Sequence, residues 1–272
     1  MKNYARVLTI AGSDSGGGAG IQADIKAISA TGGYAASAIT AITVQNTLGV
    51  KGIFPIPVST IVSQIEAVIN DIGADAIKIG MLHSSEVMRG VGKTLEKFRI
   101  RNVVLDPVMV STSGHTLMEE TAIECLKTYL IPKARVITPN IPEAKILSGE
   151  DIHSNSELRK IAKMLSMGGK VSVLMKAGHL EGENIVDIFY NAERDSFLEL
   201  PALKIHTKNT HGTGCTLSSA FASYLAQGLD LDDSARLSKA YISKAIKEGA
   251  EYEIGHGHGP VNHFFMLPKS QD

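Results

Sequence analysis

Short apolar runs alternate with longer segments that have apolar residues at helical spacing, from the start of the chain to about residue 252. Each short run ends at a glycine or a polar residue, as buried strands of a parallel sheet commonly do. The longer segments repeat apolar residues every three or four positions, which predicts helices with one buried face. The predicted strands are residues 6–12, 34–44, 74–80, 102–106, 135–138 and 171–175. The predicted helices include residues 58–72, 84–98, 119–130, 155–167 and 231–252.

Two further strands are predicted at 185–190 and 196–200, so we expect a small β-hairpin near 185–200. The alternation of strands and helices predicts an α/β fold with a doubly wound, mostly parallel sheet and helices on both faces. Neither a repeat nor a linker interrupts the pattern. Residues 1–272 are therefore expected to form a single domain.

Glycine or polar residues stand at the carboxyl ends of five predicted strands. They are Gly12, Gln45, Asp106, Asn140 and Lys176. Ligands of doubly wound sheets bind at this edge, where the strand ends face one another. The sequence therefore predicts one polar site built from residues far apart in the chain.

The most distinctive stretch is residues 209–218, NTHGTGCTLS. Gly212 and Gly214 flank Thr213, and an amphipathic helix is predicted to follow and to end at Gly228. The first N–H groups of a helix have no partner within it and carry partial positive charge. Without Cβ atoms in the way, they can close on an anion, so this turn is predicted to bind one.

A thiol lies in the same turn. We expect the positive end of the helix to favour the thiolate form of Cys215. The alternative is an ordinary loop-to-helix junction that contains a small buried cysteine.

A second glycine-rich stretch, residues 13–20, precedes a helix whose apolar stripe is Ile21, Ile25 and Ile28. The stretch fails the G-x-G-x-x-G dinucleotide pattern, because Ile21 stands where the last glycine is needed; this argues against a dehydrogenase. Asp24 falls beside the stripe and is expected either to lean toward the buried side or to favour the helix dipole.

Composition narrows the possible classes of protein. The chain has 272 residues, of which 44% are hydrophobic and 20% charged, as in ordinary globular proteins, and its net charge of −1 argues against nucleic-acid binding. No apolar run is long enough for a membrane span, and the N-terminus lacks a signal-peptide pattern. Cys125 and Cys215 form no C-x-x-C motif, so we expect a reducing cytoplasm rather than disulfides or zinc.

The strand-end residues suit phosphoryl transfer, which depends on positioning and on charge neutralisation. Lys176 could neutralise nucleotide phosphates, or it could be a solvated lysine. Asp106, Asn140 and Glu143 could hold Mg²⁺ and its waters, or they could serve only in turns and caps. The pair His256 and His258 has no third ligand at a suitable spacing, so 256–259 is interpreted as a glycine-rich loop. His211 is expected only to shape its turn.

Six motifs occur in an order that is familiar from one enzyme family. They are TIAGSDSGGGAGIQAD (9–24), AITVQNT (41–47), KIGML (78–82), VLDPVM (104–109), TPNIPEA (138–144) and NTHGTGCT (209–216). Over essentially its whole length the chain resembles the hydroxymethylpyrimidine/phosphomethylpyrimidine kinases of thiamine synthesis, in the ribokinase-like superfamily. The resemblance implies an ATP- and Mg²⁺-dependent enzyme that phosphorylates 4-amino-5-hydroxymethyl-2-methylpyrimidine and then the resulting monophosphate.

The resemblance also implies roles for particular residues. Gln45 is expected to bind the aminopyrimidine edge, in a pocket also lined by Asp24, Ala19, Val44 and Val108. At the phosphate end, Cys215 occupies the position of the catalytic base, and the turn supplies the anion hole. The phosphate and metal residues that the resemblance implies are Gly212, Thr213, Gly214, Lys176, Asn140 and Glu143; the metal role expected for Asp106 rests on its strand-end position alone.

Cys215 departs from the wider superfamily, where sugar kinases place an aspartate as base for an alcohol. The second phosphorylation uses a phosphate oxygen that is already ionised, so it needs little help from a base. We therefore hypothesise that Cys215 suits the second step better than the first. Whether it acts as a base or only positions the substrate stays open.

Two other functions compete with this interpretation. A branch of the same family with this cysteine motif phosphorylates pyridoxal, although an amide at Gln45 matches the donor and acceptor edge of an aminopyrimidine. From a different class, the chain could be a nucleotide-binding regulator without turnover. The resemblance further suggests a homodimer, and residues 111–116 are the candidate lid over the site.

Overall fold

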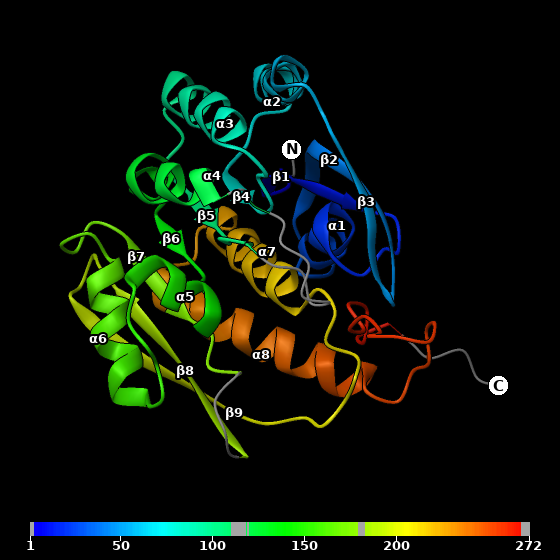
Figure 1. Cartoon of the computed structure of the whole chain (residues 1–272), viewed down its shortest axis with the longest axis vertical. Coiled ribbons are helices and arrows are strands. Elements are labelled where there is room, and N and C mark those ends of the chain that lie inside the picture. Colours follow the sequence, from blue (N-terminus) through cyan, green and yellow to red (C-terminus); the bar gives the residue numbers. More distant parts are fainter. Residues whose placement is uncertain (1–2, 110–117, 119, 179–182, 268–272) are drawn as a thin grey trace.

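A single mixed sheet organises the chain, in a computed structural model that describes residues 3–109, 118, 120–178 and 183–267. Its nine described strands lie in the order β3-β2-β1-β4-β5-β6-β7-β8-β9 (Figure 1). They are β1 Arg6–Asp14, β2 Tyr34–Asn46, β3 Gly49–Pro55, β4 Ala76–Ile79, β5 Val103–Leu105, β6 Val136–Ile137, β7 Ser172–Met175, β8 Asn184–Asn191 and β9 Ser196–Leu203.

The centre of the sheet is parallel, from β2 through β1, β4, β5 and β6 to β7. Antiparallel strands flank it: β3 pairs with β2 at one edge, and the β8–β9 hairpin closes the other. The doubly wound, mostly parallel α/β fold and the hairpin near 185–200 are therefore confirmed. Strand β3 was not predicted. Two glycines and a proline weaken the strand pattern of this segment, and its pairing with β2 supplies the missing order.

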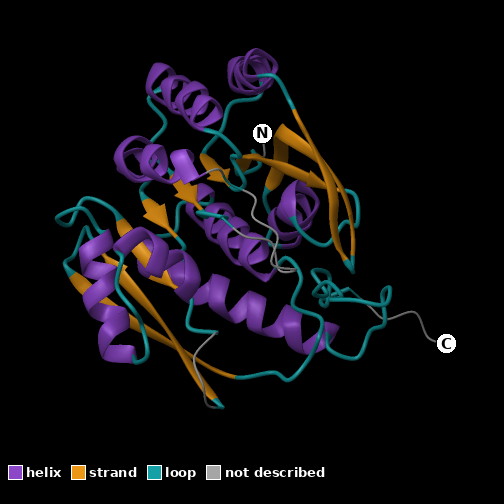
Figure 2. Ribbon diagram, in the orientation of Figure 1, coloured by secondary structure: helices purple, strands orange, loops and turns teal. Residues whose placement is uncertain are grey.

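Helices cover both faces of the sheet (Figure 2). Apolar residues of α2 to α6 form one core with one face, and those of α1, α7 and α8 form the other. The helices are α1 Gly20–Ala30, α2 Val58–Asp71, α3 Ser85–Phe98, α4 Glu120–Cys125, α5 Ile141–Ser148, α6 Asn155–Leu165, α7 Thr213–Ala226 and α8 Leu231–Gly249. Beyond α4 the chain continues as a π-helical turn, Leu126–Leu130, and a short 3₁₀ turn.

Three helices differ from their predicted form. Helix α5 was missed, because the prolines on either side of Asn140 were interpreted as breaks; Pro142 lies in the first turn, where a proline is tolerated. In α1 the buried face is centred on Asp24 and Ala27, so Ile25 of the predicted stripe is 37% exposed. The predicted amphipathic helix α7 is instead buried on nearly all sides, serines such as Ser219 included.

Within the described residues, no helix combines the length and apolarity that crossing a membrane requires.

Candidate active site

A cavity of about 800 Å³ opens at the carboxyl ends of the central strands. The five strand-end residues singled out from the sequence all line it, as we expected: Gly12, Gln45, Asp106, Asn140 and Lys176. Ala19, Val108, Glu143 and the turn at 212–215 line it as well. The predicted lid at 111–116 lies outside the described residues.

The Gly212 turn has the geometry of an anion site. Gly212 is the N-cap of α7 with a φ of 80°, a conformation that favours glycine. A Cβ atom there would lie 1.8 Å from the carbonyl oxygen of Gly18, so the second glycine-rich stretch packs directly against this turn. Thr213, Gly214 and Cys215 form the first turn of α7 and line the cavity. The amides at this helix start can therefore face an anion in the cavity.

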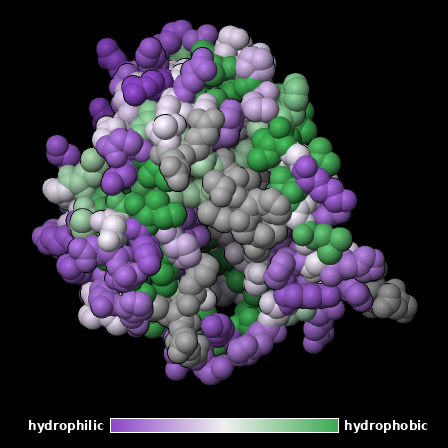
Figure 3. All heavy atoms as spheres, viewed as in Figure 1, coloured by the Kyte–Doolittle hydropathy of each residue, from purple (hydrophilic) through white to green (hydrophobic). Residues whose placement is uncertain are grey.

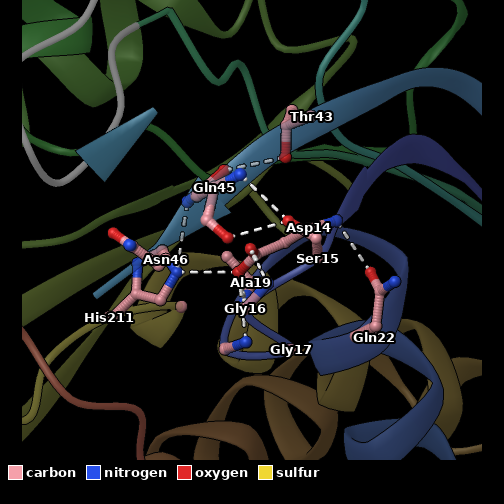
Figure 4. Close-up of polar contacts among 12 residues, drawn as sticks. Asp14, Ser15, Gly16, Gly17, Ala19, Gln22, Thr43, Gln45, Asn46 and His211 are labelled. Atoms are coloured by element: carbon pink, nitrogen blue, oxygen red, sulfur yellow. Dashed lines mark hydrogen bonds and ion pairs between the residues drawn. The ribbon is translucent and has the colours of Figure 1, made fainter. Parts of the chain in front are cut away.

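Asp14 and His211 hold the two glycine-rich turns together (Figure 4). The Asp14 carboxylate accepts hydrogen bonds from the amides of Gly16 (2.8 Å), Gly18 (3.1 Å) and Ala19 (2.8 Å). His211 Nε2 donates to it at 2.8 Å. Burial alone would raise the pKa of Asp14, but the bonds from His211 and the amides hold it below its usual value.

His211 was expected only to shape its turn, and Asp14 was not singled out. The signal for Asp14 was a carboxylate at a strand end followed by a run of glycine amides.

The Gln45 amide lies beside this cluster. Its Nε2 is 3.3 Å from Nε2 of His211, and its Oε1 accepts from Thr43 at 3.1 Å. Since the same His211 nitrogen donates its hydrogen to the ionised Asp14, it cannot also accept one from Gln45. The Gln45 side chain also lines the cavity, so its NH₂ group can donate to a ligand there.

Lys176, Asp106, Glu143 and Asn140 form a charged cluster at the neighbouring strand ends. Lys176 Nζ lies 2.9 Å from Asp106 Oδ1 and 3.8 Å from Glu143 Oε2. Asn140 and Glu143 form a capping box at the start of α5: each side chain accepts from the other's backbone amide, at 2.8 and 2.9 Å. The cap interpretation of these two residues is therefore confirmed, while their role toward a metal or nucleotide stays a prediction.

The two carboxyl groups of this cluster differ electrostatically. Burial raises the pKa of Glu143 to about 7, and Lys176 offsets only part of that effect. Burial acts on Asp106 too, but Lys176 and Lys78 outweigh it and hold the pKa of Asp106 below its usual value. Thr138 Oγ1 also donates to Asp106 at 3.0 Å. The site therefore holds one firmly ionised carboxylate and one that titrates near neutral pH.

Asp24 does not lie where the resemblance implied. It is on the buried side of α1, as one interpretation of the helix suggested, but its side chain is completely buried and lines no part of the cavity. It pairs with the equally buried Lys78 at 2.8 and 3.0 Å, and it accepts from Thr9 (2.6 Å) and Ser219 (2.7 Å). Lys78, which does line the cavity, was missed. A lysine within an apolar strand was the available signal.

Val44, like Asp24, does not line the cavity as the resemblance implied. It is 61% exposed, next to Gln45 in β2. Successive strand residues face opposite sides of a sheet, so the orientation that directs Gln45 into the cavity directs Val44 away from it.

The expectation that the helix end favours the thiolate form of Cys215 was wrong. Burial raises the pKa of its thiol to about 11, and the nearby Lys78 charge offsets only part of this effect. The helix end therefore does not produce a thiolate near neutral pH, because desolvation of the anion outweighs the favourable charges.

Comparison with known proteins identifies first the class and then the family. The chain is 35% identical to a *Bacillus subtilis* pyridoxal kinase solved with ADP, with a TM-score of 0.88 over 97% of this chain and 99% of that one. A crystal structure of phosphomethylpyrimidine kinase from *Clostridium difficile* is 46% identical, with a TM-score of 0.78 over 89% and 99%. The fold is thus that of the ribokinase-like small-molecule kinases.

Residues 14–262 match the phosphomethylpyrimidine kinase family, and the chain belongs to it. It is 45% identical to the hydroxymethylpyrimidine/phosphomethylpyrimidine kinase of *Rhizobium meliloti*, over 96% of this chain and 97% of that protein. It is also 45% identical to a thiamine biosynthesis bifunctional protein of *Geobacter sulfurreducens*, but spans only 54% of that longer protein.

Proposed function

We propose that the chain is an ATP-dependent kinase of 4-amino-5-hydroxymethyl-2-methylpyrimidine and of its monophosphate, which it converts to the diphosphate for thiamine synthesis. Family membership supports this function. The observation that carries it is a single cavity lined by the Gln45 amide, the first turn of α7 and the Lys176 cluster. Such a cavity can hold an aminopyrimidine and a triphosphate together, as phosphoryl transfer requires.

The residues divide the work between binding and charge neutralisation. Gln45 would donate to and accept from the aminopyrimidine edge, beside Ala19 and Val108. The amides of Gly214 and Cys215 would bind phosphate oxygens, and Lys176 would move from its carboxylate partners to the nucleotide phosphates. In-line transfer needs little covalent chemistry from the protein, so these hydrogen-bond donors and the lysine charge would supply most of the rate enhancement.

Asp106 and Glu143 suit a magnesium ion. Both offer carboxylate oxygens beside Lys176, and the raised pKa of Glu143 means that its ionised form would gain from a nearby cation. Among the described residues, no three or more His, Cys, Asp and Glu side chains are grouped as a metal site, so nucleotide phosphates and water would complete the coordination. Bound Mg²⁺ neutralises charge on the phosphate oxygens.

The protonated thiol supports the view that Cys215 suits the second phosphorylation better than the first. A thiol with a pKa of about 11 adds no charge to repel a phosphorylated substrate, whose attacking oxygen is already ionised. If this idea is right, Cys215→Ala should slow phosphorylation of the alcohol at least as much as phosphorylation of the monophosphate. Loss of the second phosphorylation with the first intact would therefore contradict the idea.

Pyridoxal phosphorylation is the second candidate, favoured by the structural similarity to pyridoxal kinases. Release of ADP from Mg-ATP should be compared with hydroxymethylpyrimidine, its monophosphate and pyridoxal as acceptors. Turnover of both pyrimidines, with pyridoxal weak, is the expected result. A preference for pyridoxal would reassign the substrate, and no ADP release with any acceptor would favour a non-catalytic regulator.

We also propose a homodimer formed through the β2–β3 edge. Apolar side chains project from this hairpin, including Val44 (61% exposed) and Phe54 (67% exposed), and they give the hydrophobic surface seen over β2 and β3 in Figure 3. An apolar edge of this kind calls for a partner, and a second copy of the chain would cover it. Light scattering should report a dimer, and Phe54→Glu should yield a monomer; a monomeric wild-type chain would contradict the proposal.

A cytoplasmic location fits both the use of ATP and the two free thiols, Cys125 and Cys215.

A further inference from the structure

The segment after α8 runs past the turn between β2 and β3 and then past the start of α7, and we call residues 257–263 the C-terminal strap. It first contacts the turn between β2 and β3, two residues beyond Gln45 in the sequence (Figure 1). The amides of His258 and Gly257 donate to the carbonyl oxygen and the hydroxyl of Thr47, at 2.9 and 3.2 Å. A Cβ atom at Gly257 would lie 1.9 Å from the Thr47 carbonyl oxygen, so the strap lies directly against this turn.

The strap next contacts the Gly212 turn. The amide of His211 donates to the carbonyl oxygen of Gly259 at 3.0 Å, and residues 211 and 260 form a parallel bridge. At its far end, His263 Nε2 lies 2.9 Å from Oγ1 of Thr216, in the first turns of α7. One short segment therefore touches both the substrate-side turn and the phosphate-side turn.

Thr216 Oγ1 has two partners, the His263 imidazole and the N-cap of α7. It lies 2.9 Å from His263 Nε2 and 2.8 Å from the carbonyl oxygen of Gly212. The threonine hydroxyl therefore connects His263 to the first turn of α7.

His263 is held in place for this task. Its side chain is buried, and Tyr241 donates to its carbonyl oxygen at 2.8 Å, which fixes the backbone. Burial, assisted by the charge of Lys26, lowers the pKa of His263 to about 4 and outweighs the hydrogen bond to the Val261 backbone, so the imidazole is neutral near pH 7.

We propose that His263 is a positioning residue for phosphoryl transfer: its hydrogen bond to Thr216 holds the first turns of α7 in place and so aims the first amides of that helix at the phosphate. The inference rests on the proposed kinase function. Because the strap also holds Thr47, the same segment keeps the pyrimidine end and the phosphate end at a set distance. Misplacement of reacting groups by about 1 Å costs roughly a hundredfold in rate, so a hydrogen bond at this place can matter for catalysis.

The test compares His263→Leu, which removes the hydrogen-bonding group, with His263→Gln, whose amide can still bond to Thr216. We expect His263→Leu to lower kcat by about ten- to a hundredfold while the KM for the pyrimidine changes little, and His263→Gln to recover most of the loss. The melting temperatures of both variants are measured alongside. His256→Leu is the matched control, because that imidazole is exposed and lies just outside the strap; it should behave as wild type.

A second pair addresses the same bond without disturbing the buried imidazole. Thr216→Val should reproduce the loss of kcat, and Thr216→Ser should not, because only the serine keeps the hydroxyl. Wild-type kcat in both His263→Leu and Thr216→Val would overturn the inference, as would equal losses in His263→Leu and His263→Gln that simply follow melting temperature. A wild-type chain that releases no ADP with the pyrimidine would instead count against the proposed function.

Discussion

Two lysines line the same cavity in opposite circumstances. Lys78 is fully buried, and its partner Asp24 has its oxygens saturated by the lysine, Thr9 and Ser219. Lys176 is 14% exposed and lies 2.9 Å from Asp106, but its second carboxylate, Glu143, is 3.8 Å away and poorly compensated. The first cluster is complete without a ligand, whereas the second gains from one. We infer that the first fixes the fold around the site and the second binds the reactants.

The largest effect should come from breaking the complete pair. Lys78→Met leaves the Asp24 carboxylate buried without its cation, and we expect a loss of about 3–5 kcal/mol in the free energy of unfolding. Urea denaturation at pH 7 measures it. The double variant Lys78→Met/Asp24→Leu removes both charges and should recover most of that stability. If the single variant unfolds like wild type, the pair does not have the structural role assigned to it.

Removing the other lysine should affect catalysis rather than stability. We expect Lys176→Met to lower kcat by about 10²–10³-fold, the cost of losing one preorganised electrostatic contact to the transferring group. The free energy of unfolding should change far less than in Lys78→Met. Lys170→Met, at an exposed lysine, is the control. Comparable kcat values for Lys176→Met and Lys170→Met would show that Lys176 takes no part in the reaction.

The incomplete cluster should also give a pH-dependent stability. The pKa of Glu143 is raised to about 7 from 4.5, so the folded state binds its proton more tightly than the unfolded state does. Stability should therefore fall as pH rises from 4.5 to 7, by up to about 3 kcal/mol. Glu143→Gln keeps the capping geometry without the charge and should remove this slope in urea titrations at pH 5 and 7.5. Parallel slopes for the two proteins would show that Glu143 is not the titrating group.

The smallest effect links the two clusters through Cys215. With a pKa of about 11, its alkylation by iodoacetamide should still be accelerating at about pH 10, where an ordinary thiol with a pKa of about 8.5 has levelled off. A Cys125→Ala background isolates the reaction. Lys78→Met should slow alkylation further, because the Lys78 charge lowers this pKa. A rate that has levelled off by about pH 10 would contradict the raised pKa of this thiol.

Much of the fold and of the cavity could be predicted from local pattern. Gly12, Asp106 and Lys176 end apolar runs, and parallel strands must bring such ends to one edge. For Asn140 and Glu143, however, the sequence left two alternatives open, a helix cap or a metal site. The same amide and carboxylate groups serve both, and the capping box became evident only in the structure.

The missed features depend on contacts between distant parts of the chain. Lys78 and Asp24 are separated by 54 positions, and His211 and Asp14 by 197. No periodicity within either segment reports such a pair. The prediction that Cys215 favours its thiolate form was wrong for a related reason. The sequence shows the helix start, but it does not show how strongly the fold desolvates the thiol there.

The contact between Gly212 and Gly18 has a consequence for engineering this site. The two turns meet where a Cβ atom would lie 1.8 Å from a carbonyl oxygen, so neither backbone can be remodelled while the other stays as it is. If the Gly212 turn were grafted onto another protein, residues 12–20 would have to be grafted with it as one unit. Libraries that vary the two turns together, and keep both glycines, should yield folded proteins far more often than libraries that vary either turn alone.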